Sequence, residues 1–87
     1  KSVSVGEKSI LKIKNLIVKK TFIGIASKDS SNIFLEEGKI FDNKSYCLSA
    51  YKKKQEFNGG TITYKTLFCD NPLFYSDKTS NIINYEK

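Results

Sequence analysis

The residues of this 87-residue chain whose type and spacing best indicate chemistry are its two cysteines, Cys47 and Cys69. Between them lies Asn58-Gly59, a pair typical of tight hairpin turns, with β-prone runs on both sides. A three-residue loop, Phe57-Asn58-Gly59, sets Cys47 opposite Cys69 in an antiparallel hairpin. A two-residue turn sets Cys47 opposite Asp70, on the wrong face. We therefore expect a Cys47–Cys69 disulfide, which stabilises the fold by roughly 3 kcal/mol in the chain-entropy model.

A disulfide in a small domain indicates an oxidising compartment. We therefore expect the protein to be secreted or periplasmic. Because the chain starts at Lys1 rather than at methionine, we also expect that a leader, a tag or a membrane-anchoring segment has been removed. The alternative is a cytosolic domain in which two free cysteines pack as small hydrophobic side chains.

The chain contains no histidine, which removes the commonest general base near neutral pH and every His-ligated metal site. Two thiols alone are too few ligands for zinc. Carboxylates lie close in sequence at Glu36-Glu37 and between Asp70 and Asp77, but neighbouring charges in a short domain are typical of solvated surface. We expect no enzymatic activity, no cofactor and no metal.

All fifteen basic residues are lysine, and they outnumber nine acidic residues to give a net charge of +6. Without the planar fork of arginine, bidentate recognition of guanine or phosphate is not available. The composition therefore disfavours sequence-specific DNA binding. Lysine point charges instead favour salt-sensitive attraction to a polyanion or to an acidic protein.

The candidate binding residues are the run Lys52, Lys53 and Lys54 together with Tyr51 and Phe57, which flank it. An aromatic ring beside ammonium groups is suited to stacking on bases or sugars. The alternative is a solvated hairpin tip whose charge discourages edge-to-edge strand pairing. The chain also has five tyrosines, more than the core can hold, and exposed tyrosine favours an interface with a partner.

Short β-prone runs separated by turn residues predict an all-β fold for residues 1–87, taken as a single small domain. We expect a small antiparallel barrel or sandwich of five to seven strands, with a disulfide-bridged hairpin. The expected strands cover residues 2–5, 21–26, 33–36, 39–41, 46–51, 61–69 and 82–85. The pair 33–36 and 39–41 reads as a second hairpin with its turn at Glu37-Gly38.

Residues 9–20 fit either a strand or a basic amphipathic helix, which would suit contact with a membrane surface. The abundance of isoleucine and valine favours a strand with a bend near Lys19-Lys20. Gly24, inside the next run, indicates a bulge or a close backbone approach. No apolar run is long enough to span a bilayer.

We expect the core to hold eleven apolar side chains, with aromatic rings supplying much of the burial. These residues are Ile13, Phe22, Ile23, Ile25, Leu35, Ile40, Leu48, Ala50, Ile62, Tyr64 and Phe68.

Taken together, these features predict an exported, non-enzymatic binding module that engages a protein or a glycan. An inhibitor, a lipoprotein domain or a subunit of an envelope or secretion assembly would fit this description. The alternative is a cytosolic barrel, similar to oligonucleotide-binding folds, that binds single-stranded nucleic acid or another polyanion through the lysine-rich hairpin.

Overall fold

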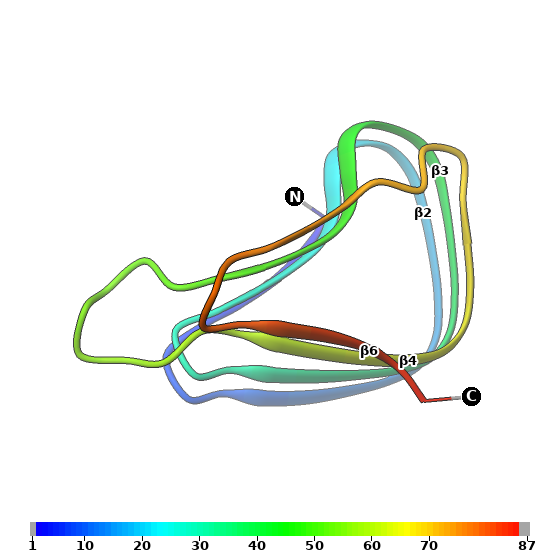
Figure 1. The fold of residues 1–87 in the computed structure, drawn as a ribbon. Coiled ribbons are helices and arrows are strands. Elements are labelled where there is room, and N and C mark those ends of the chain that lie inside the picture. Colours follow the sequence, from blue (N-terminus) through cyan, green and yellow to red (C-terminus); the bar gives the residue numbers. More distant parts are fainter. Residues whose placement is uncertain (1, 86–87) are drawn as a thin grey trace.

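The chain folds into a parallel β-solenoid of about four turns, as a computed structural model that describes residues 2–85 shows (Figure 1). The strands are β1 (Val3–Val5), β2 (Ile10–Lys28), β3 (Asn32–Tyr51), β4 (Thr61–Cys69), β5 (Phe74–Ser76) and β6 (Asn81–Asn84). Within the described part, each strand pair is parallel. The all-β prediction is confirmed, but the predicted antiparallel barrel or sandwich is wrong.

Each coil of the solenoid places a residue directly beside its counterpart in the next coil. Ile13 of β2 pairs with Leu35 of β3, and Leu35 pairs with Tyr64 of β4. Tyr64 in turn pairs with Asn84 of β6. The chain therefore advances by one coil after each circuit, and it does not turn back on itself as in a hairpin.

The coils have a triangular outline (Figure 1), and we name the three sides by their residues. The first face comprises residues 10–15, 32–37, 61–66 and 81–84. The second face comprises residues 16–19, 38–41 and 67–69. The third face comprises residues 3–5, 23–28, 46–51 and 74–76.

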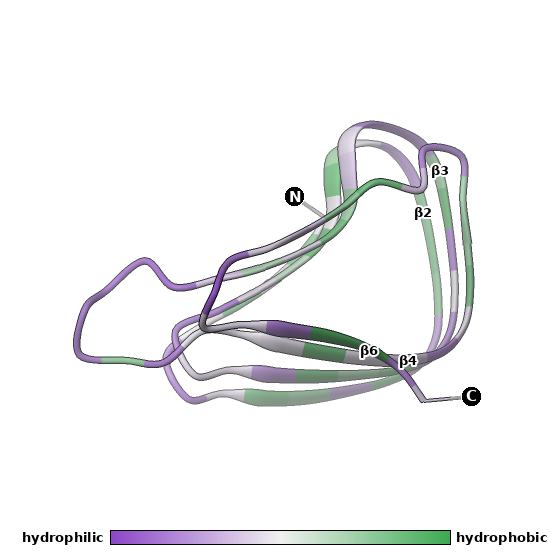
Figure 2. Cartoon of the chain, in the orientation of Figure 1, coloured by the Kyte–Doolittle hydropathy of each residue, from purple (hydrophilic) through white to green (hydrophobic). Residues whose placement is uncertain are grey.

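Strict alternation of inward and outward side chains runs along each face, and it fails where the chain turns a corner. Lys14 and Asn15 are both exposed, and so are Glu36 and Glu37 one coil later. Glu37-Gly38 is therefore a corner within the single strand β3, and the predicted hairpin there is wrong. Figure 2 shows the resulting alternation of hydrophobic and hydrophilic residues along the strands.

Left-handed backbone at non-glycine residues makes the next corners. Lys20 has a φ of 59°, which confirms the predicted bend and keeps residues 10–28 as one strand rather than a helix. Asp42 takes the same position in the following coil, with a φ of 54°. Beside it, Asn43 Nδ2 donates to the carbonyl of Asn71 at 2.8 Å, and Asn71 N donates to Asn43 Oδ1 at 3.1 Å. These bonds satisfy polar groups at the corner between coils.

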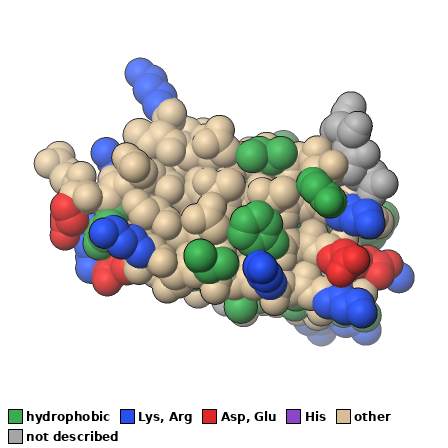
Figure 3. Space-filling model, turned by 90° about the horizontal axis from the view of Figure 1, so that it is seen from below, with side chains coloured by type: hydrophobic (Ala, Val, Ile, Leu, Met, Phe, Trp, Pro, Cys, Tyr) green, Lys and Arg blue, Asp and Glu red, His purple; other side chains and the backbone are tan. Residues whose placement is uncertain are grey.

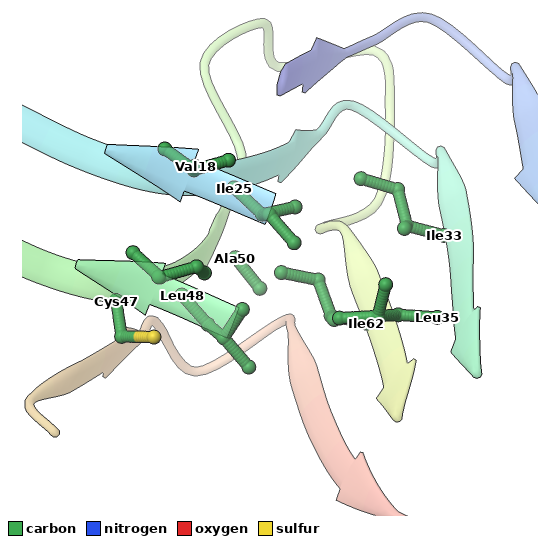
Figure 4. Close-up of a cluster of buried hydrophobic side chains, with 9 residues drawn as sticks. Val18, Ile25, Ile33, Leu35, Cys47, Leu48, Ala50 and Ile62 are labelled. Atoms are coloured by element: carbon green, nitrogen blue, oxygen red, sulfur yellow. The ribbon is translucent and has the colours of Figure 1, made fainter. Parts of the chain in front are cut away.

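The interior is a stack of aliphatic side chains, because a narrow solenoid leaves room for one such side chain from each coil. Figure 4 shows these side chains pointing toward one another. Nine residues form this cluster: Val18, Ile25, Ile33, Leu35, Ile40, Cys47, Leu48, Ala50 and Ile62.

The predicted core is confirmed for its aliphatic members and wrong for two of its aromatic members. Buried as predicted are Ile25, Leu35, Ile40, Leu48, Ala50 and Ile62, while Ile13, Ile23 and Tyr64 are partly buried. Phe22 and Phe68 are 63% and 49% exposed, because they occupy outward positions of their strands. The rings therefore decorate the surface and do not fill the core.

The Cys47–Cys69 disulfide is present, as predicted. It joins β3 to β4, with a Cα–Cα distance of 6.1 Å. The predicted hairpin geometry behind it is wrong, since β3 and β4 are parallel and Cys69 pairs in register with Ile40. The bond therefore fastens one coil to the next.

Gly24 makes the close approach that its position predicted. A Cβ atom there would lie 2.6 Å from the carbonyl oxygen of Cys47 and 2.7 Å from Cδ1 of Ile40. The strand register also shifts between Thr21 and Ile23. Separately, the described part of the chain contains no helix that is long and apolar enough to cross a membrane.

Candidate functional site

The predicted binding residues lie on a loop, residues 52–60, that leaves one corner of the solenoid between β3 and β4. In Figure 1 this loop extends well beyond the triangular body. Tyr51 ends β3 and is half-buried, whereas Lys52 and Lys53 are exposed. The loop is a coil-to-coil insertion and not the tip of a hairpin, so the predicted setting of the lysine run is wrong.

Two carboxylates hold the backbone of this loop against the solenoid. Asp29 Oδ1 accepts hydrogen bonds from the amides of Lys53 at 2.7 Å and Lys54 at 2.9 Å. Asp77 Oδ2 accepts one from the amide of Lys52 at 2.8 Å. The loop is thus anchored at its N-terminal half, where the three lysines lie.

These hydrogen bonds favour the ionised form of both carboxyl groups. The amide of Lys54 lowers the pKa of Asp29 below its ordinary value, against the opposing effect of burial. Burial also raises the pKa of Asp77, but hydrogen bonds from Ser80, Lys52 and Thr79 outweigh it, so that this pKa is lowered as well. Both groups are structural acceptors.

The two lowered pKa values predict a loss of stability in acid. A group with a lower pKa in the folded state stabilises the fold above its unfolded pKa, and this contribution disappears as the pH falls through the folded pKa. We expect the melting temperature to fall by several degrees between about pH 5 and about pH 2, and the double variant Asp29→Asn/Asp77→Asn to show a smaller fall. Thermal unfolding followed by circular dichroism measures both. Equal pH dependence in the variant and the wild type would contradict this role.

Two of the predicted binding residues already have partners within the chain. Lys54 forms an ion pair with Glu7, and the hydrogen bond between them raises the pKa of Lys54. Lys8 Nζ lies 6.0 Å from the ring centroid of Phe57. The structure therefore brings Lys54 and Phe57 together with residues 7 and 8.

Sequence reasoning missed a groove of about 560 Å³ on the first face. Figure 3 views this face from below and shows hydrophobic side chains among lysines, with acidic groups toward one end. The outward side chains that line the groove are Lys12, Lys14, Phe34, Glu36, Thr63, Lys65 and Tyr85.

The groove is built from two columns that cross the strands. In the first column, Lys12 pairs with Phe34, and Phe34 pairs with Thr63. The second column lies two residues further along each strand. It contains Lys14, Glu36, Lys65 and Tyr85.

Pairing of lysine with phenylalanine on neighbouring coils recurs outside the groove. On the second face, Lys19 pairs with Phe41 and Lys39 pairs with Phe68. The Phe41 and Phe68 rings lie 5.5 Å apart between centroids. The outward faces thus combine partly exposed rings with ammonium groups in a regular arrangement.

A repeat of 22 residues is the signal that could have revealed this arrangement. Lys12 and Phe34 are separated by this interval, and so are Lys19 and Phe41. The apolar inward positions follow the same spacing, as for Ile13 and Leu35. Recurrence at a fixed interval is the sequence signature of a solenoid.

Within residues 2–85 no group of three or more Cys, Asp or Glu residues is placed to hold a metal ion. In comparisons with known proteins, no family model, no curated protein and no solved structure matches the chain. The functional argument therefore depends on the residues and their geometry.

Proposed function

We propose that the protein is an exported, non-enzymatic binding module that presents the outer faces of a disulfide-stabilised solenoid to another macromolecule. The observation that carries this proposal is the pairing of Lys12 with Phe34, repeated at Lys19 with Phe41 and at Lys39 with Phe68. Aromatic rings that are neither buried nor needed for the core are favoured at binding surfaces.

The disulfide supports export. Cys47 is fully buried and the bond to Cys69 joins two coils, so it is part of the folded structure. Structural disulfides persist in oxidising compartments and are rare in the cytosol.

The carboxylates support a binding role over a catalytic one. A general acid or base near neutral pH needs a pKa close to the working pH. The pKa values of Asp29 and Asp77 are shifted away from that range, and both side chains are occupied with the backbone of loop 52–60. These two residues are therefore suited to holding the loop and not to proton transfer.

Binding of single-stranded nucleic acid was the alternative expected from the sequence. It assumed an oligonucleotide-binding barrel and a lysine-rich hairpin, and the solenoid has neither. The excess of lysine still suits a polyanion, so oligonucleotides belong among the ligands to be tested.

The proposal is tested with the oxidised protein on a panel of immobilised acidic and neutral glycans, at low and at high salt. We expect binding to at least one class of glycan, and loss of that binding in the variant Phe34→Ala/Phe41→Ala/Phe68→Ala. Circular dichroism checks that this variant is folded, which we expect because its rings lie outside the hydrophobic core. Absence of binding to every glycan, or full binding by the folded variant, would contradict the proposal.

Export is tested by intact-mass measurement of protein isolated from its natural source, with and without a reductant. We expect reduction to add the mass of two hydrogens, since one disulfide opens. An unchanged mass would mean that both thiols are free in the natural compartment, and would contradict export.

A further inference from the structure

We propose that the groove on the first face binds a linear acidic polysaccharide, with the sugar chain running across the strands along the column of Lys12, Phe34 and Thr63. This inference rests on the proposed function and names its ligand class and site. The competing site is loop 52–60.

The column provides a platform for a sugar ring. Phe34 is 42% exposed, lies in the groove, and is flanked in register by Lys12 and Thr63. Neighbouring strands are about 4.8 Å apart. This spacing is close to the length of one sugar unit in an extended polysaccharide, so successive units can meet successive strands.

The charge of the groove is complementary to an acidic ligand. Lys12, Lys14 and Lys65 line it, and Glu36 is the one carboxylate among its lining residues. Lysine supplies separate point charges. Such charges suit carboxylate or sulfate groups that recur at intervals along a polysaccharide. The hydroxyl groups of Thr63 and Tyr85 add partners for sugar hydroxyls, and Tyr85 is 69% exposed.

The same geometry disfavours single-stranded nucleic acid. Successive bases stack on successive aromatic side chains. The register neighbours of Phe34 are Lys12 and Thr63, and neither of them is aromatic. Tyr85 lies in the other column.

The loop offers fewer groups to a ligand than the groove does. Lys54 is in an ion pair with Glu7, and Phe57 lies near Lys8. A ligand at the loop would compete with these contacts, whereas Phe34 in the groove is open to solvent.

The test measures the affinity of the oxidised full chain for four probes. They are a heparin oligosaccharide, an oligogalacturonate, a neutral cello-oligosaccharide and an oligothymidylate. The groove variants are Phe34→Ala and Lys12→Gln/Lys65→Gln. The matched controls are Phe22→Ala, which removes an exposed ring on another side, and Lys52→Gln/Lys53→Gln, which removes the same charge from the loop.

We expect at least one acidic oligosaccharide to bind, and each groove variant to weaken it by about tenfold or more, as loss of a central aromatic or charged contact does. Both controls should stay within about twofold of the wild type. Binding should also weaken as salt is added.

Three results would overturn the groove assignment while leaving the proposed function intact. The groove variants could retain full affinity, the loop variant alone could lose it, or the neutral oligosaccharide could bind as tightly as the acidic ones. Tighter binding of the oligothymidylate would overturn the carbohydrate class. Failure of the wild type to bind any saccharide here or on the glycan panel would overturn the proposed function as well.

Discussion

Replacing Gly60 with alanine is expected to lower the free energy of unfolding by about 3 kcal/mol, since overpacking of a rigid site costs this much. A Cβ atom at this position would lie 2.0 Å from the carbonyl oxygen of Ser27 and 2.8 Å from the amide nitrogen of Lys28. Both are backbone atoms of a neighbouring strand. They cannot move without disturbing the strand pairing of β2, so the substitution strains the whole coil.

The surroundings of Gly60 leave no alternative place for the extra atom. The Gly60 amide donates to Ser80 Oγ at 3.1 Å. Ser27 Oγ lies 2.6 Å from Ser31 Oγ, and Ser31 Oγ donates to the carbonyl of Val5 at 3.0 Å. This buried polar cluster joins several coils at one corner, and each of its members is satisfied only in the present geometry.

Chemical denaturation of the oxidised protein measures the effect, and Gly6→Ala is the matched control. At Gly6 the nearest atom to a new Cβ is Cε of Lys28, 3.0 Å away, at the far end of a flexible side chain that can move aside. We expect this control to change stability by less than about 1 kcal/mol. Equal stability of Gly60→Ala and Gly6→Ala would contradict the packing at the corner.

Opening the Cys47–Cys69 disulfide is the second large effect that we expect. The two cysteines are 22 residues apart, and closing a loop of this length contributes about 3 kcal/mol in the chain-entropy model. Because the bond joins β3 to β4, its loss should loosen the coils that follow β3 first.

Comparison of the reduced with the oxidised wild-type protein measures this contribution without changing any side chain. We expect the reduced protein to unfold at a clearly lower denaturant concentration. Hydrogen exchange should become faster in β4 and β6 before it does in β2. The variant Cys47→Ala/Cys69→Ala should resemble the reduced protein, with an added cost for the smaller side chain at the buried Cys47 position. Identical unfolding of the reduced and oxidised proteins would contradict the stabilising role of the bond.

The positions of the strands could be predicted from the sequence, but their pairing could not. Alternation such as that from Leu11 to Val18 specifies an extended chain with one buried side. The same alternation serves antiparallel and parallel neighbours equally well. The choice between them depends on the 22-residue interval, which relates residues far apart in the chain.

Local turn chemistry was misleading at Asn58-Gly59. The pair is typical of a hairpin, but neither Gly59 nor Gly60 has a positive φ. Both are needed for close packing instead, since a Cβ at Gly59 would lie 2.0 Å from Ser80 Oγ. The disulfide was predicted correctly from an incorrect hairpin, because both arrangements bring Cys47 near Cys69.

The candidate site was predictable only where it is local. The run from Lys52 to Lys54 stands out in the sequence and lies on an exposed loop. The groove is assembled from single residues of successive coils, such as Lys12, Phe34 and Thr63. No short segment contains this pattern, so it appears only once the coils are in register.

The most direct test of the solenoid is the pattern of nuclear Overhauser contacts between backbone protons of the isotopically labelled, oxidised protein. In-register parallel coils predict contacts of Leu35 with both Ile13 and Tyr64, and the same constant offset for the residues that follow them. An antiparallel hairpin would instead link Ser49 with Leu67 and Tyr51 with Lys65. Observation of this second pattern would contradict the solenoid and every site built on it.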